Sequence, residues 1–420
     1  MARKSKGLGK KLGQQMDLKI FVLAAAATSG LITTVGSGVS ISRPVDHNSG
    51  SPSMFIASDA WQKFQSATPA QRAKYCPANN KRAKRIMSLR WVPKTWPEKV
   101  EGFNSRMDNF RTVYGAKEIG TLTKRFPAFV MLSVSENRTE NYTKALDILV
   151  NMAKQKAFLE TINCLDSDGK YAHCDMAWKR KDGQDIAPIK DYSLVQTNIV
   201  KIEWNYKAFL RQHATPQQSE VIDGYFAEWH PRQRPFSTLW FGLHMGWLWN
   251  EIDTGYNPES TMESAIEQLT DMVHPDGSLE GRTNRGNRAL WYHQDGLNET
   301  LATMEIARHY GVEIPQELVD KVEKAAEIWV RGYKDHSFLD KWAKEANMSV
   351  HTPGKQEYRK TASRQDMGNS WFYLFMYRYP DSPLVPEIEE LLAGDYQNAI
   401  YDRKIGIGLG CIYGTARSVN

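Results

Sequence analysis

Hydrophobic residues recur three and four positions apart along most of the chain, as they do on one face of an α-helix. This pattern predicts helices over 142–161, 193–213, from 215 onward, 238–252, 260–273, 288–310, 315–333 and 366–379. The helix at 215 begins with Thr215-Pro216-Gln217-Gln218, in which Thr can cap, Pro suits the first turn and Gln supports a capping box. Strand-like alternation is scarce, and no glycine-rich phosphate loop follows a strand, which disfavours a nucleotide-binding α/β fold.

Proline and glycine separate most of the predicted helices, at Asn257-Pro258, Pro275-Asp276-Gly277, Gly311 and Pro380. Successive helices joined by short loops form antiparallel hairpins. Over roughly 330 residues such hairpins form either a solenoid or a closed toroid. The chain has no internal repeat of fixed length, which argues against a regular solenoid. We therefore expect an all-α fold built from stacked helical hairpins.

The N-terminal region has the pattern of an export signal. Basic residues precede an apolar stretch over 18–35, and small residues follow at 36–38. An uncleaved anchor is the alternative, and no other segment is apolar enough to span a bilayer. We expect a signal peptide and leader over 1–40, an extended arm with N-terminal helices over 41–110, and a catalytic domain over 111–420. The mature protein is expected to be secreted or periplasmic, with no stable membrane partner.

The four cysteines suit an oxidising compartment. Cys164 and Cys174 flank a turn-rich loop and could form a local disulfide, whereas Cys76 and Cys411 either pair or stay reduced. Neither a Cys-x-x-Cys pair nor a His/Cys cluster indicates a structural zinc site.

Charge and composition favour an anionic partner other than nucleic acid. The net charge is +6, and the basic runs at 81–85 and 179–181 are too short to form a nucleic-acid-binding stripe. The 13 Trp and 18 Tyr residues exceed the needs of a minimal core, and their flat amphipathic rings suit sugars. The sequence does not indicate an oligomeric state.

The segment 276–294 has the richest chemistry. It contains a turn, three arginines and Trp-Tyr-His at the start of a long predicted helix. If that helix extends back to Arg285, then Arg285, Arg288 and Tyr292 share one face. Paired arginines can hold a carboxylate through charge-assisted hydrogen bonds and favour the phenolate form of a neighbouring tyrosine.

These residue types match the requirements of β-elimination beside a uronate carboxylate. Neutralising the carboxylate stabilises the enolate-like intermediate that follows removal of the proton on the adjacent carbon. A tyrosine can take that proton, and the same tyrosine or a histidine can protonate the departing glycosidic oxygen.

Arg285-x-x-Arg288-Ala289-Leu290-x-Tyr292-His293 resembles the Arg-x-x-Arg-Ala-Leu-x-Tyr-His-Asn signature of the alginate lyase family. The preceding Asp276-Gly277-Ser278-Leu279-Glu280 also resembles the family's sequence. This resemblance implies an (α/α) toroid, which is an incomplete barrel of helical hairpins. It also implies that the protein needs no metal or organic cofactor. It further implies that Arg285 and Tyr292 are catalytic and that the substrate is an acidic polysaccharide such as alginate or glucuronan.

A second resemblance concerns a histidine. His244-Met245-Gly246-Trp247 is similar to the end of the family's Asn-Asn-His-x-x-Trp element, with Gly242-Leu243 in place of the two asparagines. This register implies that His244 is catalytic. The alternative register aligns Trp240 with the family's tryptophan and places Ser237 at the histidine position.

The residues expected to bind substrate include amides that could replace the missing asparagine. The helix before Trp204 offers Gln196 and Asn198 for the uronate carboxylate. The other expected substrate contacts are Arg288, His293, Trp240, Trp247 and Trp291.

Two other functions fit parts of the sequence. An inverting glycoside hydrolase on a helical toroid would need two carboxylates across the scissile bond, and Asp295, Glu299, Glu251 and Asp253 are available. A non-catalytic protein that binds acidic polysaccharide would explain the missing asparagine pair. Hydrolysis leaves a saturated sugar end and elimination an unsaturated one, so the product distinguishes the two reactions.

Overall fold

The computed structural model describes residues 50–101, 113–161, 178–179, 185–186, 190–229, 258–344, 356, 370–394, 400, 402 and 405–419. The chain divides into two compact units, Met1–Arg43 and Pro44–Asn420, and all described residues belong to the second. Within the described residues, no helix is long and apolar enough to cross a bilayer.

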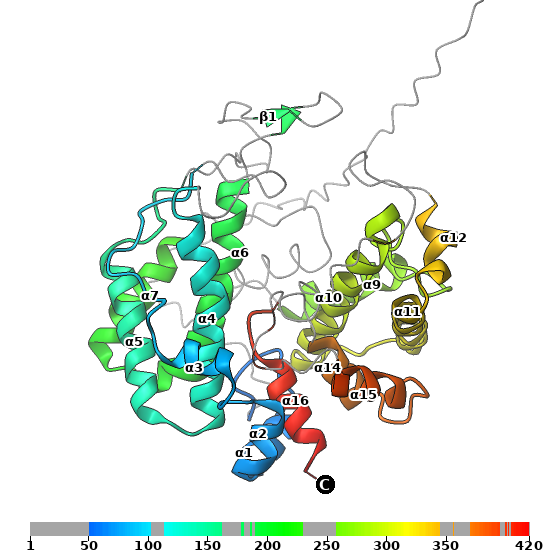
Figure 1. Cartoon of the computed structure of the whole chain (residues 1–420), viewed down its shortest axis with the longest axis horizontal. Helices are drawn as coiled ribbons and strands as arrows, with labels where there is room; N and C mark the ends of the chain where they lie inside the picture. The colour runs from blue at the N-terminus through cyan, green and yellow to red at the C-terminus, as the bar shows by residue number, and fades with distance from the viewer. Residues whose placement is uncertain are drawn as a thin grey trace, which may run out of the picture. The chain divides into compact units, whose positions relative to one another are not determined.

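Helices account for nearly all of the described elements (Figure 1). The first part of the chain contains α1 (Ser58–Ser66), α2 (Pro69–Tyr75), α3 (Lys81–Met87), α4 (Ala116–Ser135), α5 (Thr139–Lys154), α6 (Lys190–Asn205), the π-helix η1 (Tyr206–Leu210), the 3-10 helix η2 (Arg211–His213) and α7 (Pro216–Trp229). The second part contains α9 (Pro258–Met272), the 3-10 helix η4 (Gly286–Arg288), α10 (Ala289–His309), α11 (Gln316–Lys334), the 3-10 helix η5 (His336–Leu339), α12 (Asp340–Ala343), α14 (Ser370–Arg378), α15 (Val385–Gly394) and α16 (Leu409–Arg417). The strands β1 (Trp178–Lys179) and β2 (Asp185–Ile186) pair antiparallel, with Trp178 opposite Ile186.

Most of the predicted helices that fall within the described residues are present, with shifted ends. The segment 142–161 is helical only to Lys154, because Lys156 and Phe158 adopt positive φ angles that end the helix. The capping box at Thr215 is confirmed: the Thr215 N–H donates to Gln218 Oε1 (3.0 Å), and the Gln218 N–H donates to Thr215 Oγ1 (3.2 Å). The predicted helix 238–252 and residues 366–369 lie outside the described residues.

The hydrophobic pattern did not reveal α4, α15 or α16. Every residue of α4 from Phe126 to Ser135 is buried, so this half of the helix lacks the polar face that makes a helical period visible. Gly115 precedes α4 with φ of 69°, and a side chain there would meet the Lys99 carbonyl oxygen at 2.2 Å. The start of α4 therefore requires glycine.

The helices form two sets of neighbours. In one set, α4 packs against α5 and α6, and α5 packs against α7 (Figure 1). In the other, α10 packs against α9, α11 and α14. The C-terminal helix α16 packs against α14 and also against α1 and α2, so the two ends of the described chain share one core.

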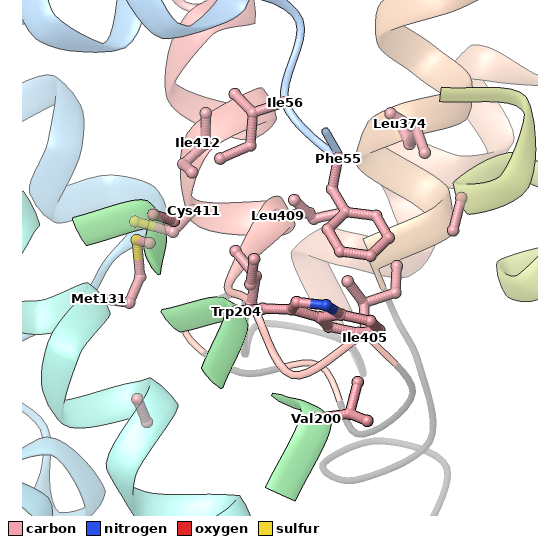
Figure 2. Packing of buried hydrophobic residues seen from close by; sticks show 14 of the residues in the cluster. Phe55, Ile56, Met131, Val200, Trp204, Leu374, Ile405, Leu409, Cys411 and Ile412 are labelled. Atoms are coloured by element: carbon pink, nitrogen blue, oxygen red, sulfur yellow. The ribbon is translucent and has the colours of Figure 1, made fainter. Parts of the chain in front are cut away.

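This shared core includes residues that precede the first helix. Phe55 and Ile56 are buried and lie beside Leu409 and Ile412 of α16, as Figure 2 shows. Phe55 also meets the Trp204 ring edge-on, with centroids 4.8 Å apart. Part of the segment predicted as an extended arm is therefore packed in the core. A disulfide between Cys76 and Cys411 joins the same two regions. Of the two alternatives for these cysteines, pairing or remaining reduced, the structure shows pairing.

Helix α10 is buried on nearly all sides although its sequence is rich in polar residues. Near its C-terminal end, Glu305 accepts hydrogen bonds from Arg378 Nε (2.8 Å) and Nη2 (2.6 Å), from Arg308 and from the Tyr413 hydroxyl (3.1 Å). Burial lowers the pKa of Arg378, but its bonds to Glu305 outweigh burial and raise that pKa overall. Buried charges are tolerated only when they are paired in this way, so these ion pairs fix how α10, α14 and α16 pack.

Candidate active site

An Asp-Gly-Ser turn opens the arginine-rich segment. The Asp276 carboxylate accepts hydrogen bonds from the Ser278 N–H (3.0 Å) and hydroxyl (2.7 Å) and from Trp342 Nε1 (2.9 Å). Gly277 has φ of 85°, and a side chain there would come within 2.5 Å of the Lys324 backbone in α11. The turn therefore lies directly against α11, and its glycine permits this close approach.

Thr283 and His293 connect this segment to the interior. The Leu279 N–H donates to Thr283 Oγ1 (2.7 Å), and Thr283 Oγ1 lies 2.8 Å from His293 Nδ1. The other ring nitrogen, Nε2, lies 2.7 Å from the Ala325 carbonyl oxygen, which can only accept. His293 is thus neutral with its proton on Nε2, and the Thr283 hydroxyl donates to Nδ1. Burial lowers the pKa of His293 to about 4, which agrees with a neutral ring.

The start of α10 is held by a side chain from a distant part of the sequence. Gln356 donates to the Gly286 carbonyl oxygen (2.9 Å) and accepts from the Leu290 N–H (3.1 Å). Its side chain therefore joins the 3-10 turn η4 to the first turn of α10. This bridge determines how the arginines on either side of Gly286 are presented.

Arg285 does not lie on α10, so the condition under which Arg285, Arg288 and Tyr292 would share one helical face is not met. Its backbone has φ of −97° and ψ of 35°, and Gly286 follows with φ of 54°, which breaks the helix. The guanidinium nevertheless reaches Tyr292 and lies over its ring, 4.2 Å from the centroid. Arg288 instead lies over the Trp291 ring at 5.9 Å. The structure thus pairs each arginine with its own aromatic residue, and all four side chains are partly exposed.

The environment of Arg285 combines burial with positive charge. Burial lowers the pKa of its guanidinium, nearby Arg282 lowers it further, and Tyr292 and Asp295 act in the opposite direction. Arg285 Nε donates to the Gly281 carbonyl oxygen (2.6 Å), which fixes the side chain. A guanidinium fixed in this way can bind an external carboxylate through charge-assisted hydrogen bonds.

His293 and the two candidate amides do not lie at this surface. His293 has no exposed area and both of its ring nitrogens are engaged, so its predicted contact with substrate is wrong and its place is structural. Gln196 and Asn198 are 4% and 7% exposed and lie on α6, which packs mainly against α4. The structure therefore groups these amides with a helix pair other than that of α10.

Several predicted residues lie outside the described residues. They are His244, Ser237, Trp240, Trp247, Glu251, Asp253, Cys164 and Cys174.

The carboxylates that a hydrolase would use on α10 are buried. Asp295 is 5% exposed and Glu299 is 4% exposed, and Glu299 forms an ion pair with Arg282, which is 1% exposed. Neither carboxylate is presented to a polymer at this surface. In the part of the chain that the structure describes, no group of three His, Cys, Asp or Glu side chains could hold a metal ion.

Comparison with known proteins gives matches at the level of structure alone. No family model and no curated protein matches the sequence. The crystal structure of alginate lyase A1-III from Sphingomonas species A1 matches with a TM-score of 0.55 and 14% identity, covering 88% of this chain and 97% of that one. A histidine-to-alanine variant of alginate lyase A1-III, in its apo form, matches with a TM-score of 0.51 and 14% identity, covering 82% of this chain and 97% of that one.

The chain has the alginate lyase fold. The predicted all-α (α/α) toroid is therefore confirmed, and so is the structural likeness to alginate lyases that the motif around Tyr292 predicted. Because the sequences are only 14% identical, the likeness establishes the fold and does not establish the reaction.

Within the alginate lyase fold, three supporting residues were missed from the sequence. Arg282 and Thr283 lie in the arginine-rich segment but carried no signal that separated them from its other polar residues. Gln356 lies 70 positions from Gly286, and no motif connects the two. Contacts of this kind depend on tertiary packing and become visible only in the fold.

Proposed function

We propose that this protein is a polysaccharide lyase that cleaves a uronate-containing polymer by β-elimination. The observation that carries the proposal is the Arg285 guanidinium held over the Tyr292 ring at 4.2 Å, at a partly exposed position within the alginate lyase fold. The two side chains supply a carboxylate-binding cation and a proton-transfer group within reach of one sugar residue.

In the proposed reaction, Arg285 binds the uronate carboxylate and withdraws negative charge from it. Tyr292, as phenolate, removes the proton from the carbon that bears the carboxylate, and the electron pair remains as an enolate-like intermediate. That pair then forms a carbon–carbon double bond as the glycosidic carbon–oxygen bond breaks. Tyr292 returns its proton to the departing oxygen, so one residue serves as base and then acid. His244 is proposed as a further catalytic residue, which would allow a histidine base and a tyrosine acid.

The substrate is proposed to be polymannuronate, polyguluronate, glucuronan or a related polymer. The two structural neighbours are alginate lyases by their descriptions, and the net charge of +6 suits an acidic polymer. Arg288 and Trp291 form the second arginine–aromatic pair and are proposed to bind a neighbouring sugar, together with Trp240 and Trp247. Gln196 and Asn198 remain proposed ligands of the uronate carboxylate, provided that substrate binding exposes them.

We also propose that the protein is exported, with a signal peptide and leader over 1–40, an extended arm with N-terminal helices over 41–110 and the catalytic domain over 111–420. The Cys76–Cys411 disulfide supports export, because such bonds persist mainly in oxidising compartments. The reaction proposed here uses side chains of this chain alone and calls for no cofactor.

The test is to incubate purified protein with each of the three polyuronates and with a neutral polysaccharide as control. Ultraviolet absorbance reports the unsaturated sugar of elimination, and a reducing-end assay reports cleavage of either kind. We expect both signals to rise together with at least one polyuronate and neither with the neutral polymer. Reducing ends without absorbance would indicate hydrolysis and would overturn the proposal, and polymer binding without either signal would indicate a non-catalytic binding protein.

A further inference from the structure

A second basic and aromatic surface lies on α12, beside the arginine-rich turn. Lys341 Nζ lies 3.8 Å from the centroid of the Trp342 ring, the shortest distance among the described cation–ring pairs. Lys341 is exposed and Trp342 is partly exposed. The pair therefore presents a positive charge and a flat apolar ring together.

The Trp342 side chain is fixed in place by the turn that opens the candidate active site. Its Nε1 donates to Asp276 Oδ2 (2.9 Å), and the Phe338 ring packs against it edge-on with centroids 5.8 Å apart. A ring whose orientation is set by a hydrogen bond and an aromatic neighbour loses little entropy when a ligand stacks on it. Fixed aromatic platforms of this kind suit the apolar face of a sugar.

Helix α12 is also in contact with η4, the 3-10 turn that ends at Arg288. Helix α12, which carries Lys341, is therefore a neighbour of the turn that leads into α10. A polymer with one carboxylate on every sugar that extended from η4 onto α12 would bring a further carboxylate to Lys341. The same physical features recur at Arg285, Arg288 and Lys341: a cation against an aromatic ring.

We propose that Lys341 and Trp342 form an additional subsite that binds a uronate residue of the polymer away from the cleaved bond. This inference rests on the proposed function, since it assigns a further part of the same substrate to the protein. Lys341 binds the carboxylate through a charge-assisted hydrogen bond, and Trp342 contacts the apolar face of the sugar ring. The subsite contributes affinity for long chains and takes no part in the chemical step.

The experiment is native electrophoresis in gels that contain polymannuronate, polyguluronate or glucuronan, with wild type, Lys341→Ala, Lys341→Arg and Lys344→Ala. Lys344 is exposed at the end of α12, so Lys344→Ala removes the same charge without removing the cation at Trp342. We expect the dissociation constant for the polymer to rise about two- to fivefold in Lys341→Ala, as for loss of one exposed ionic contact. Lys341→Arg and Lys344→Ala should remain close to wild type.

Equal retardation of Lys341→Ala and Lys344→Ala would overturn the subsite, whether or not wild type cleaves the polymer. Cleavage by wild type with unchanged binding in Lys341→Ala would overturn this inference alone. Absence of binding to all three polyuronates by wild type would overturn both the subsite and the proposed function. Unchanged thermal unfolding of the variants confirms that a difference in binding does not come from misfolding.

Discussion

The two ends of α10 use arginine in opposite ways. At the C-terminal end, Arg378 and Arg308 bind the buried Glu305 carboxylate, which compensates their charge within the protein. At the N-terminal end, Arg285 donates to the Gly281 carbonyl oxygen and lies over the Tyr292 ring, and burial and Arg282 outweigh Asp295 and Tyr292, so the pKa of Arg285 is lowered overall. The first arrangement stabilises packing, whereas the second keeps a cation available for an external carboxylate.

The difference shows why charge alone does not identify a site on this helix. Glu305 is 3% exposed, and its ion pairs join α10 to α14 and α16. The Arg285–Tyr292 pair is partly exposed and is fixed by a backbone carbonyl, so it is positioned before a ligand arrives. Preorganised charge at an accessible position is what stabilisation of an anionic intermediate requires. Substitutions at the two ends should therefore have different consequences.

The largest expected effect is that of Tyr292→Phe at the N-terminal end. This variant keeps the ring over which Arg285 lies but removes the proton-transfer group, so the rate of absorbance increase should fall about 10²- to 10⁴-fold. Tyr310→Phe, at the other end of α10, is the matched control and should retain wild-type activity. Similar rates in Tyr292→Phe and wild type would remove Tyr292 from the mechanism.

Arg378→Met should produce a comparable loss, but in stability. It removes both Arg378 hydrogen bonds from the buried Glu305 carboxylate, which keeps Arg308 and Tyr413 as partners, and each hydrogen bond to a charged group contributes about 1.5–3 kcal/mol. Denaturant unfolding should show the lower free energy of unfolding, while the rate per folded molecule stays near that of wild type. A folded variant with a strongly reduced rate would show that the two ends of α10 are not functionally separate.

Arg285→Lys should reduce the rate by about 10²- to 10³-fold, because a lysine retains the charge but not the paired donors that hold a carboxylate. Arg308→Lys provides the same substitution at the other end and should leave the rate unchanged. Steady-state kinetics with the best polyuronate separate the effects on kcat and KM. Equal rates in the two variants would contradict the assignment of Arg285.

His293 gives a smaller, pH-dependent effect. Burial keeps it neutral in the folded state with a pKa of about 4, whereas the unfolded chain takes up a proton near pH 6.5. The unfolded state therefore binds more protons between these values, and stability falls as pH decreases from about 6.5 to 4. The loss from this residue approaches about 3 kcal/mol at the acid end. Denaturant unfolding across this range should show a shallower dependence in His293→Gln, and an identical dependence would exclude His293 as the source.

The sequence allowed the helical hairpins to be predicted because α5, α9 and α11 have one apolar and one polar face. It did not reveal α4, which is buried over most of its length. The motif around Tyr292 predicted the arginine–tyrosine pair, but not the 3-10 turn that Gln356 stabilises. His293 was assigned to the surface because its burial depends on α11, which contacts it only in the folded chain.

The most direct test of the central claim is mass spectrometry of oligomers formed from a polyuronate by wild type and by Tyr292→Phe. Hydrolysis adds one water molecule across the cleaved bond, whereas elimination adds none. Each oligomer with a new non-reducing end formed by elimination should therefore be lighter than the corresponding hydrolysis product by the mass of one water molecule. We expect unsaturated oligomers from wild type and almost none from Tyr292→Phe. Saturated oligomers from wild type, or unsaturated oligomers in equal yield from the variant, would contradict elimination by the Arg285–Tyr292 pair.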